Sequence, residues 1–155
     1  MTTWGLKFSW AKEDFRPLHN ARLEGIDTKV SFKKLIINSR AIVPCSGYYE
    51  WKKTDNKKIP YYFTKVDDQD IFLAGIHDNG QFCVITKNAE PNNSEVHHRQ
   101  PVIVPKSQIN NYFNLNNNAV EFLNNTNPPK LKFFEISTDV NNPAKNDPSI
   151  INPVK

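Results

Sequence analysis

Short apolar runs separated by polar turn residues dominate this chain, a pattern typical of β-strands joined by tight turns. The pattern predicts strands at residues 4–8, 40–44, 47–52, 61–64, 71–76, 81–86, 102–104 and 133–137. Hairpin turns are expected at Asp55-Asn56-Lys57-Lys58 and at Asp78-Asn79-Gly80, because these residues favour turn conformations. The strands between residues 40 and 86 are therefore predicted to pair mostly in the antiparallel sense.

Helical spacing is confined to short segments. Phe32, Leu35 and Ile36 recur at i, i+3 and i+4, which predicts an amphipathic helix over residues 31–37. Further short helices are expected at 89–98, 107–113 and 119–123, with a helical turn at 9–13 and an irregular loop at 15–25. Since strands dominate, we predict an α+β fold with a mostly antiparallel, barrel-like sheet and short peripheral helices, forming one domain over residues 1–155.

Composition narrows the class of protein. The chain has 155 residues, of which 38% are hydrophobic and 12% aromatic, enough to bury a core. No apolar run approaches the length of a membrane span and the N-terminus lacks a signal-peptide pattern, so we expect a cytoplasmic protein with no membrane partner. The net charge of +4 is compatible with nucleic acid, but its lysines are dispersed.

The two cysteines, Cys45 and Cys83, have neither metal-ligand spacing nor the pattern of a disulfide framework. We expect both to be buried reduced thiols, and we expect no metal ion and no cofactor. The adjacent His97 and His98 do not change this expectation, because neighbouring residues on a helix point about 100° apart.

Residues 40–51, R-A-I-V-P-C-S-G-Y-Y-E-W, hold the first candidate for chemistry. We predict a strand, a turn in which Gly47 supplies a positive φ, and a returning strand in which Tyr48 and Glu50 share one face. Glu50 then has two interpretations. It is a cross-strand ion-pair partner, or its aromatic neighbours, Trp51 among them, raise its pKa and make it a proton carrier.

Two further segments could carry function. In Val96–Pro101, His97 or His98 could act as a general acid or base, and the fork of Arg99 suits a phosphate. In Asn20-Ala21-Arg22, a turn-forming role for Asn20 competes with a place in a binding site. Trp10 and Trp51 could stack on nucleic-acid bases, although a tryptophan is more often part of a core.

Together these segments resemble the SOS response-associated peptidase (SRAP) family, which handles abasic sites in single-stranded DNA. The resemblance follows the chain in order: Trp4-Gly5-Leu6 with Ser9-Trp10-Ala11-Lys12, then N-A-R-x-E at 20–24, R-x-x-V-P-x-x-G-x-Y-E-W at 40–51, A-G-I at 74–76, Thr86 with Ala89, H-x-R-x-P at 97–101, where Gln100 replaces the family's Met, and S-T-x-V-N at 137–141. Each motif alone is weak, but the whole set in this order is specific.

The resemblance implies a mechanism in which an N-terminal cysteine forms a thiazolidine with the aldehyde of an abasic site, a DNA–protein crosslink. It implies that Glu50 shuttles protons, that His97 assists ring opening and that Asn20 orients the sugar or the terminus. By the same resemblance the DNA is held by Arg22 and Arg99 at phosphates, by Trp10 and Trp51 at bases, and by Thr86.

The chain departs from the family at its start, because the family's M-C-G-R-F start and the few tens of residues that follow it are absent. The chain begins at the Trp4-Gly5-Leu6 segment, and its residue 2 is Thr2. We therefore expect a single SRAP-like domain without the family's N-terminal segment, impaired crosslinking, and self-association through an exposed sheet edge. Two other functions stay open: a non-catalytic module that binds single-stranded DNA, and a thiol peptidase using Cys45 and His97. The peptidase ranks last because Cys45 has no basic neighbour in sequence.

Overall fold

The computed structural model describes residues 2–154, and these form two compact units. Unit 1 contains residues 2–44, 72–87 and 101–128, and unit 2 contains residues 45–71, 88–100 and 129–154. Each unit is built from segments that are far apart in the sequence. The single domain over residues 1–155 stays a prediction.

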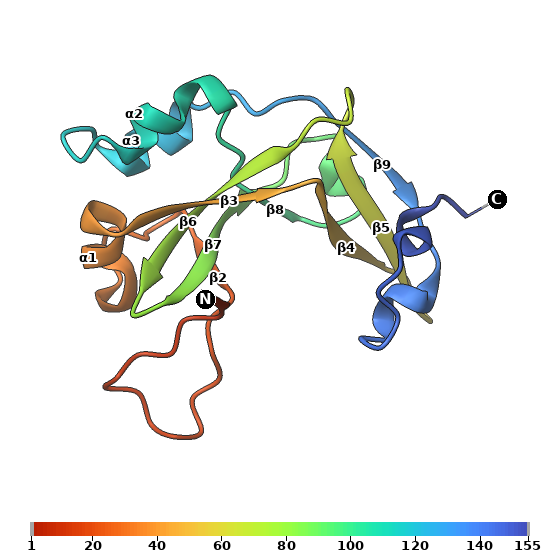
Figure 1. Cartoon of the computed structure of the whole chain (residues 1–155), viewed down its shortest axis with the longest axis horizontal. Helices are drawn as coiled ribbons and strands as arrows, with labels where there is room; N and C mark the ends of the chain where they lie inside the picture. Colours follow the sequence, from red (N-terminus) through yellow and green to blue (C-terminus); the bar gives the residue numbers. More distant parts are fainter. Residues whose placement is uncertain (1, 155) are drawn as a thin grey trace. The chain divides into compact units, whose positions relative to one another are not determined.

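The sheet of unit 1 has the strand order β1 (Thr3–Trp4), β7 (Gln81–Asn88), β6 (Ile71–Asp78) and β3 (Arg40–Cys45) (Figure 1). A further strand, β2 (Asn20–Arg22), also pairs with β7, and both β1 and β2 run parallel to it. The β6–β7 hairpin is antiparallel and turns at Asn79 and Gly80, which both have positive φ. The tight turn predicted at Asp78-Asn79-Gly80 is thus confirmed.

Short helices complete unit 1. They are α1 (Val30–Asn38), the 3-10 helix η2 (Lys106–Gln108), α2 (Ile109–Phe113) and α3 (Ala119–Asn125), of which α2 and α3 lie side by side (Figure 1). In α1, Phe32 and Ile36 are buried, as their spacing predicts. The side chain of Asn118 accepts hydrogen bonds from two backbone amides at the start of α3 and so caps this helix.

Arg40 holds several backbone segments of unit 1 in place. Only 7% of its surface is exposed, and burial lowers the pKa of its guanidinium. It donates hydrogen bonds of 2.8–2.9 Å to the carbonyl oxygens of Ile36, Tyr112, Asn114 and Asn117. A single side chain thus satisfies helix-end and loop carbonyls that would otherwise be left without donors.

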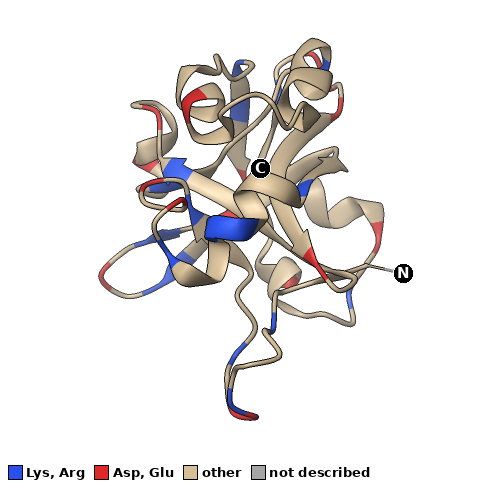
Figure 2. Cartoon of the chain, turned by 90° about the vertical axis from the view of Figure 1, so that its left-hand side faces the viewer, with Lys and Arg blue, Asp and Glu red and all other residues tan. Residues whose placement is uncertain are grey.

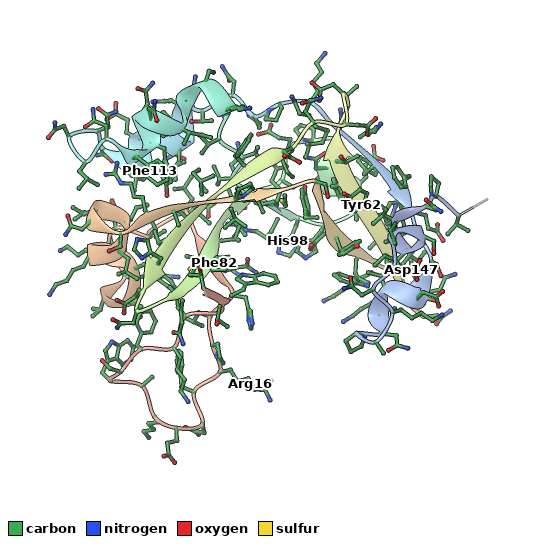
Figure 3. All side chains as sticks on the ribbon, viewed as in Figure 1. Arg16, Tyr62, Phe82, His98, Phe113 and Asp147 are labelled. Carbon is green, nitrogen blue, oxygen red and sulfur yellow. The ribbon has the colours of Figure 1, made fainter. Side chains whose placement is uncertain are left out.

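Unit 2 is built on an antiparallel sheet of order β4 (Gly47–Lys53), β5 (Lys58–Lys65) and β9 (Leu131–Glu135). On one face, Tyr48, Phe63 and Phe133 stack across the strands with ring centroids 4.9 and 4.8 Å apart. On the other, Tyr62 of β5 packs against aromatic neighbours on both flanking strands (Figure 3). Cross-strand aromatic pairs of this kind stabilise the sheet.

The remaining elements of unit 2 are the 3-10 helices η1 (Asn93–Glu95), η3 (Thr138–Asn141) and η4 (Pro148–Ile151) and the strand β8 (Arg99–Pro101). After η4 the chain returns to the end of β9, where Ile136 bridges Pro153 (Figure 1). Among residues 2–154, no helix is long and apolar enough to cross a membrane.

The turn predicted at residues 44–47 is wrong. Pro44 and Cys45 extend β3, which pairs with β6, while the expected returning strand, β4, pairs with β5. Gly47 has no positive φ either. A Cβ at Gly47 would instead clash with the backbone oxygen of Phe63, so the glycine is needed for close approach between strands.

Other short elements differ from their predictions. The strand predicted at 4–8 covers only β1, and beyond it Leu6 makes an isolated bridge to Leu18. The loop predicted at 15–25 contains β2, the segment 9–13 has turns without a helix, and 89–98 has only the three-residue η1. Residues 102–104 follow β8 and contain only a bridge at Ile103. In such short segments tertiary hydrogen bonds outweigh local periodicity.

The other predicted strands and helices are confirmed, with ends that differ by a few residues. The α+β class is confirmed as well, since strands in mostly antiparallel sheets dominate and the helices are few and short.

Candidate acid–base site

Glu50 and His97 form the centre of the site in unit 2. Oε1 of Glu50, on β4, lies 3.0 Å from Nδ1 of His97, and about a quarter of each side chain is exposed. Burial raises the pKa of Glu50, and the interaction with His97 opposes this to a smaller extent. The carboxyl group is therefore poised to hold a proton at a higher pH than an ordinary glutamate.

The other neighbours of His97 define how this proton can be shared. Its Nδ1 lies 3.2 Å from both the backbone N and the backbone O of Arg99. When protonated, Nδ1 can donate to Glu50; when bare, it can accept from the Arg99 N–H and from a protonated Glu50. The pair can thus pass one proton between carboxyl and imidazole. No residue in the described part of the chain hydrogen-bonds to Nε2 of His97.

Gln100 organises the loop that carries His97. Its buried side-chain oxygen accepts hydrogen bonds from the backbone N–H of Glu90, at 2.8 Å, and from the side-chain amide of Asn93, at 2.7 Å. The backbone O of Asn93 in turn accepts from the N–H of His97, at 3.3 Å. The residue that replaces the family's Met in the H-x-R-x-P segment therefore has a structural role here.

Replacing Gln100 by Met is expected to destabilise the protein by about 1–3 kcal/mol, because the buried amide of Asn93 loses its acceptor. Denaturant unfolding measures this free energy. Gln100→Glu, which keeps the acceptor oxygen, is the control. Equal stability of Gln100→Met and the unmodified protein would show that the loop does not depend on these hydrogen bonds.

A cavity of about 460 Å³ adjoins the pair. It is lined by Glu50, Trp51, Lys53, Lys58, His97 and Asn141. The indole N–H of Trp51 donates to the side-chain oxygen of Asn141, at 2.9 Å, which fixes the ring. Sequence reasoning missed Asn141, Lys53 and Lys58 as site residues, although the S-T-x-V-N segment and the lysine pairs beside the turn were visible.

The remaining candidates fall into two groups. In unit 1, Asn20 and Arg22 are exposed on β2 while Ala21 between them is buried, and Arg22 is in register with Thr86 of β7. The structure thus brings these candidates together on one pair of strands. In unit 2, Nη1 of Arg99 donates to the side chain of Asn88, at 2.7 Å.

Trp10 lies on the long loop between Leu6 and Leu18, which also carries Arg16 (Figure 3). It is 64% exposed and stacks on Phe8, with ring centroids 5.1 Å apart. An exposed aromatic face held flat by a buried ring is suited to stacking on a planar ligand.

The thiols are poor nucleophiles. Burial is the main cause that raises the pKa of Cys45, and burial raises the pKa of Cys83 to about 12. Since the thiolate is the reactive form, neither residue has the environment of a catalytic cysteine. Among residues 2–154 there is also no group of three His, Cys, Asp or Glu side chains that could hold a metal ion.

Burial also affects Tyr48, which precedes Glu50 on the same face of β4. Its hydroxyl is buried without a hydrogen-bond partner among residues 2–154, and burial together with Glu50 raises its pKa. Tyr48 therefore stays neutral beside the carboxyl group, so it adds no charge next to the acid–base pair.

Basic residues are spread over strands, loops and short helical segments (Figure 2). These features define an α+β protein with a carboxyl–imidazole site that borders aromatic and basic side chains. The model of the family described as SOS response associated peptidase (SRAP) matches residues 1–143, and the chain belongs to this family.

Individual relatives agree with this assignment. The chain is 30% identical to the abasic site processing protein YoqW of Bacillus subtilis, over 96% of this chain and 73% of the relative. It is 35% identical to the abasic site processing protein YedK of Escherichia coli, over 65% of this chain and 48% of the relative. A crystal structure of a protein from Bacteroides thetaiotaomicron superposes with a TM-score of 0.86 at 28% identity, covering 98% of this chain and 75% of that one.

Proposed function

We propose that this protein binds single-stranded DNA at an abasic site and reacts with the open-chain aldehyde there, with Glu50 and His97 as its acid–base pair. The observation that carries the proposal is the 3.0 Å contact between Glu50 and His97 beside a cavity with aromatic and basic walls. Membership of a family whose relatives are named abasic site processing proteins supports the choice of substrate.

The acid–base pair suits the dehydration step of imine formation. An amine attacks C1′ of the aldehyde to give a carbinolamine, and loss of its hydroxyl as water requires a proton. The protonated carboxyl group of Glu50 supplies this proton, and Nδ1 of His97 returns one to it. The raised pKa of Glu50 supports this role, because a general acid must be protonated near the working pH.

The other candidates act as binding groups in this proposal. Asn20 orients the sugar, Arg22 and Arg99 contact phosphates, and Thr86 contributes a polar group beside Arg22. The aromatic faces of Trp10 and Trp51 stack on flanking bases. Such contacts predict binding with little sequence preference and with an affinity that falls as salt rises.

We further propose that a polypeptide of residues 1–155 forms an imine and not a thiazolidine. A thiazolidine ring needs an amine and a thiol on one residue, and neither Met1 nor Thr2 carries a thiol. An imine at C1′ makes the C2′ proton acidic, so loss of that proton expels the 3′ phosphate and cleaves the strand by β-elimination.

Abasic single-stranded DNA incubated with this polypeptide is expected to give an adduct only when borohydride is present, because borohydride reduces the imine to a stable amine. A denaturing gel with and without reductant measures both the adduct and the cleaved strand. The same DNA with the abasic aldehyde reduced beforehand is the control and should give neither product.

A heat-stable adduct formed without borohydride would contradict the imine, and mass spectrometry of the adduct would then identify the residue attached. DNA binding without any adduct or cleavage would favour the alternative of a non-catalytic module for single-stranded DNA. Cleavage of casein by the protein would support the alternative that it is a thiol peptidase, which the raised pKa of Cys45 disfavours.

A further inference from the structure

Two lysines face each other at the end of the β4–β5 hairpin. Lys53 and Lys58 are directly opposed in the antiparallel register, so their side chains leave the sheet on the same face. Both are exposed and both line the cavity that adjoins Glu50 and His97. Like charges placed directly opposite each other destabilise a strand pair, so this arrangement calls for a compensating group.

No carboxylate of the described residues supplies that compensation. Neither lysine forms an ion pair among residues 2–154, and the nearby acidic side chains do not neutralise their charge. Glu50 is in contact with His97, and Asp55 at the hairpin tip lies within 4 Å of neither ammonium. The segment 52–58 carries four lysines and one aspartate, which leaves a local excess of positive charge.

An aromatic platform lies beside the lysine pair. Trp51 and Lys53 are two residues apart on β4, so they share a face and their Cα atoms are about 7 Å apart. The hydrogen bond to Asn141 holds the indole in place. An aromatic ring next to two ammonium groups matches one nucleotide unit, with a base on the ring and its phosphate on the lysines.

We infer that Lys53 and Lys58 form a phosphate subsite, which binds one phosphodiester group of the DNA strand next to the abasic residue. This inference rests on the proposed function, since it assigns a contact to the same substrate. It also explains the opposed lysines, because an anion bound between them removes their repulsion. Lys52 and Lys57, in the same hairpin, do not line the cavity and lie outside this subsite.

The test is binding of a short single-stranded oligonucleotide that carries tetrahydrofuran, an unreactive abasic analogue. Lys53→Gln and Lys58→Gln are each expected to weaken binding by more than about twofold, and the double variant by about fivefold at 0.1 M salt, since the single-strand phosphate contact that they share contributes a salt exponent of about 0.7. The slope of log affinity against log salt should decrease by about the same exponent. Lys53→Arg and Lys58→Arg keep the charge and should retain the affinity.

Neutral methylphosphonate groups, placed one at a time along the oligonucleotide, locate the contact. One position beside the abasic analogue should weaken binding to the unmodified protein about fivefold, as expected for one lost phosphate contact. The same substitution should have no effect on the Lys53→Gln, Lys58→Gln double variant. Equal losses in both proteins at every position would overturn the subsite. So would displacement of the oligonucleotide by inorganic phosphate much more effectively than by sodium chloride at the same ionic strength, because the site would then bind free phosphate.

Matched variants exclude a general charge effect. Lys52→Gln and Lys57→Gln remove the same charge from the same hairpin and should weaken binding less than twofold. Lys58→Glu creates an opposite-charge pair with Lys53 and should raise the midpoint of thermal unfolding by up to about 4 °C while it weakens binding. Equal losses of affinity in all four single Lys→Gln variants would contradict a localised subsite.

The outcomes separate this inference from the proposed function. The binding assay uses an unreactive analogue, so it does not depend on acid–base chemistry at Glu50. If the borohydride adduct forms with reactive DNA while the lysine variants bind normally, the function stands and the subsite is wrong. If the lysine variants lose affinity but no adduct forms, the lysines bind DNA in a protein that does not process abasic sites.

Discussion

Replacing Glu50 by Gln is expected to slow formation of the borohydride-trapped adduct with abasic single-stranded DNA by about 10²–10⁴-fold, the usual contribution of a general acid–base group. The amide has nearly the shape of the carboxyl group but cannot donate an acidic proton to the carbinolamine. Single-turnover adduct formation at saturating DNA measures the rate, and binding of the tetrahydrofuran oligonucleotide should change little. A normal rate in Glu50→Gln would remove Glu50 from the chemistry.

The raised pKa of Glu50 can be tested directly by NMR. Carbon-detected NMR should place the titration midpoint of Glu50 above 4.5, the ordinary value, because burial disfavours the charged carboxylate. In His97→Asn the midpoint should move higher still, since the interaction with His97 lowers the pKa of Glu50. A midpoint at or below 4.5 in the unmodified protein would mean that Glu50 is simply an ion-pair partner.

Replacing Arg40 by Ala is expected to destabilise the protein by about 2–6 kcal/mol. Two of its hydrogen bonds, to the carbonyl oxygens of Ile36 and Tyr112, are buried, and each buried acceptor left without a donor costs about 1–3 kcal/mol. Denaturant unfolding gives the free energy. Arg40→Lys keeps the charge but loses the planar fork, so it should be intermediate.

Arg22→Ala is the matched control for this variant, because Arg22 is exposed on β2. It should change the stability by no more than about 0.5 kcal/mol, as surface substitutions usually do. If Arg40→Ala and Arg22→Ala were equally stable, the carbonyl hydrogen bonds of Arg40 would not contribute to folding.

The long, regular elements could be predicted because their side-chain pattern is local. The spacing of Phe32 and Ile36 identified α1, and the Asn79-Gly80 turn identified the β6–β7 hairpin. Short segments could not be predicted in this way. β2 is only three residues long and exists because β7 pairs with it, which no pattern within residues 20–22 reveals.

The site shows the same division. Glu50 and His97 could each be selected from the residue types around them and from the resemblance to a family. The contact between the two residues could not be predicted from the sequence. They are separated by 46 positions, and the loop of His97 depends on the side chain of Gln100. The opposed lysines are another case, since the register that pairs Lys53 with Lys58 is set by the strands and not by the lysines.

The sequence by itself therefore determined the α+β class, the main strands and helices, and the family with its candidate residues, because periodicity and ordered motifs are properties of the chain. Only the tertiary structure decided that Gly47 is needed for close strand approach, that Arg40 binds four carbonyl groups and that Oε1 of Glu50 lies 3.0 Å from Nδ1 of His97. Burial and long-range hydrogen bonds set these properties, and both depend on residues that the folded chain brings together.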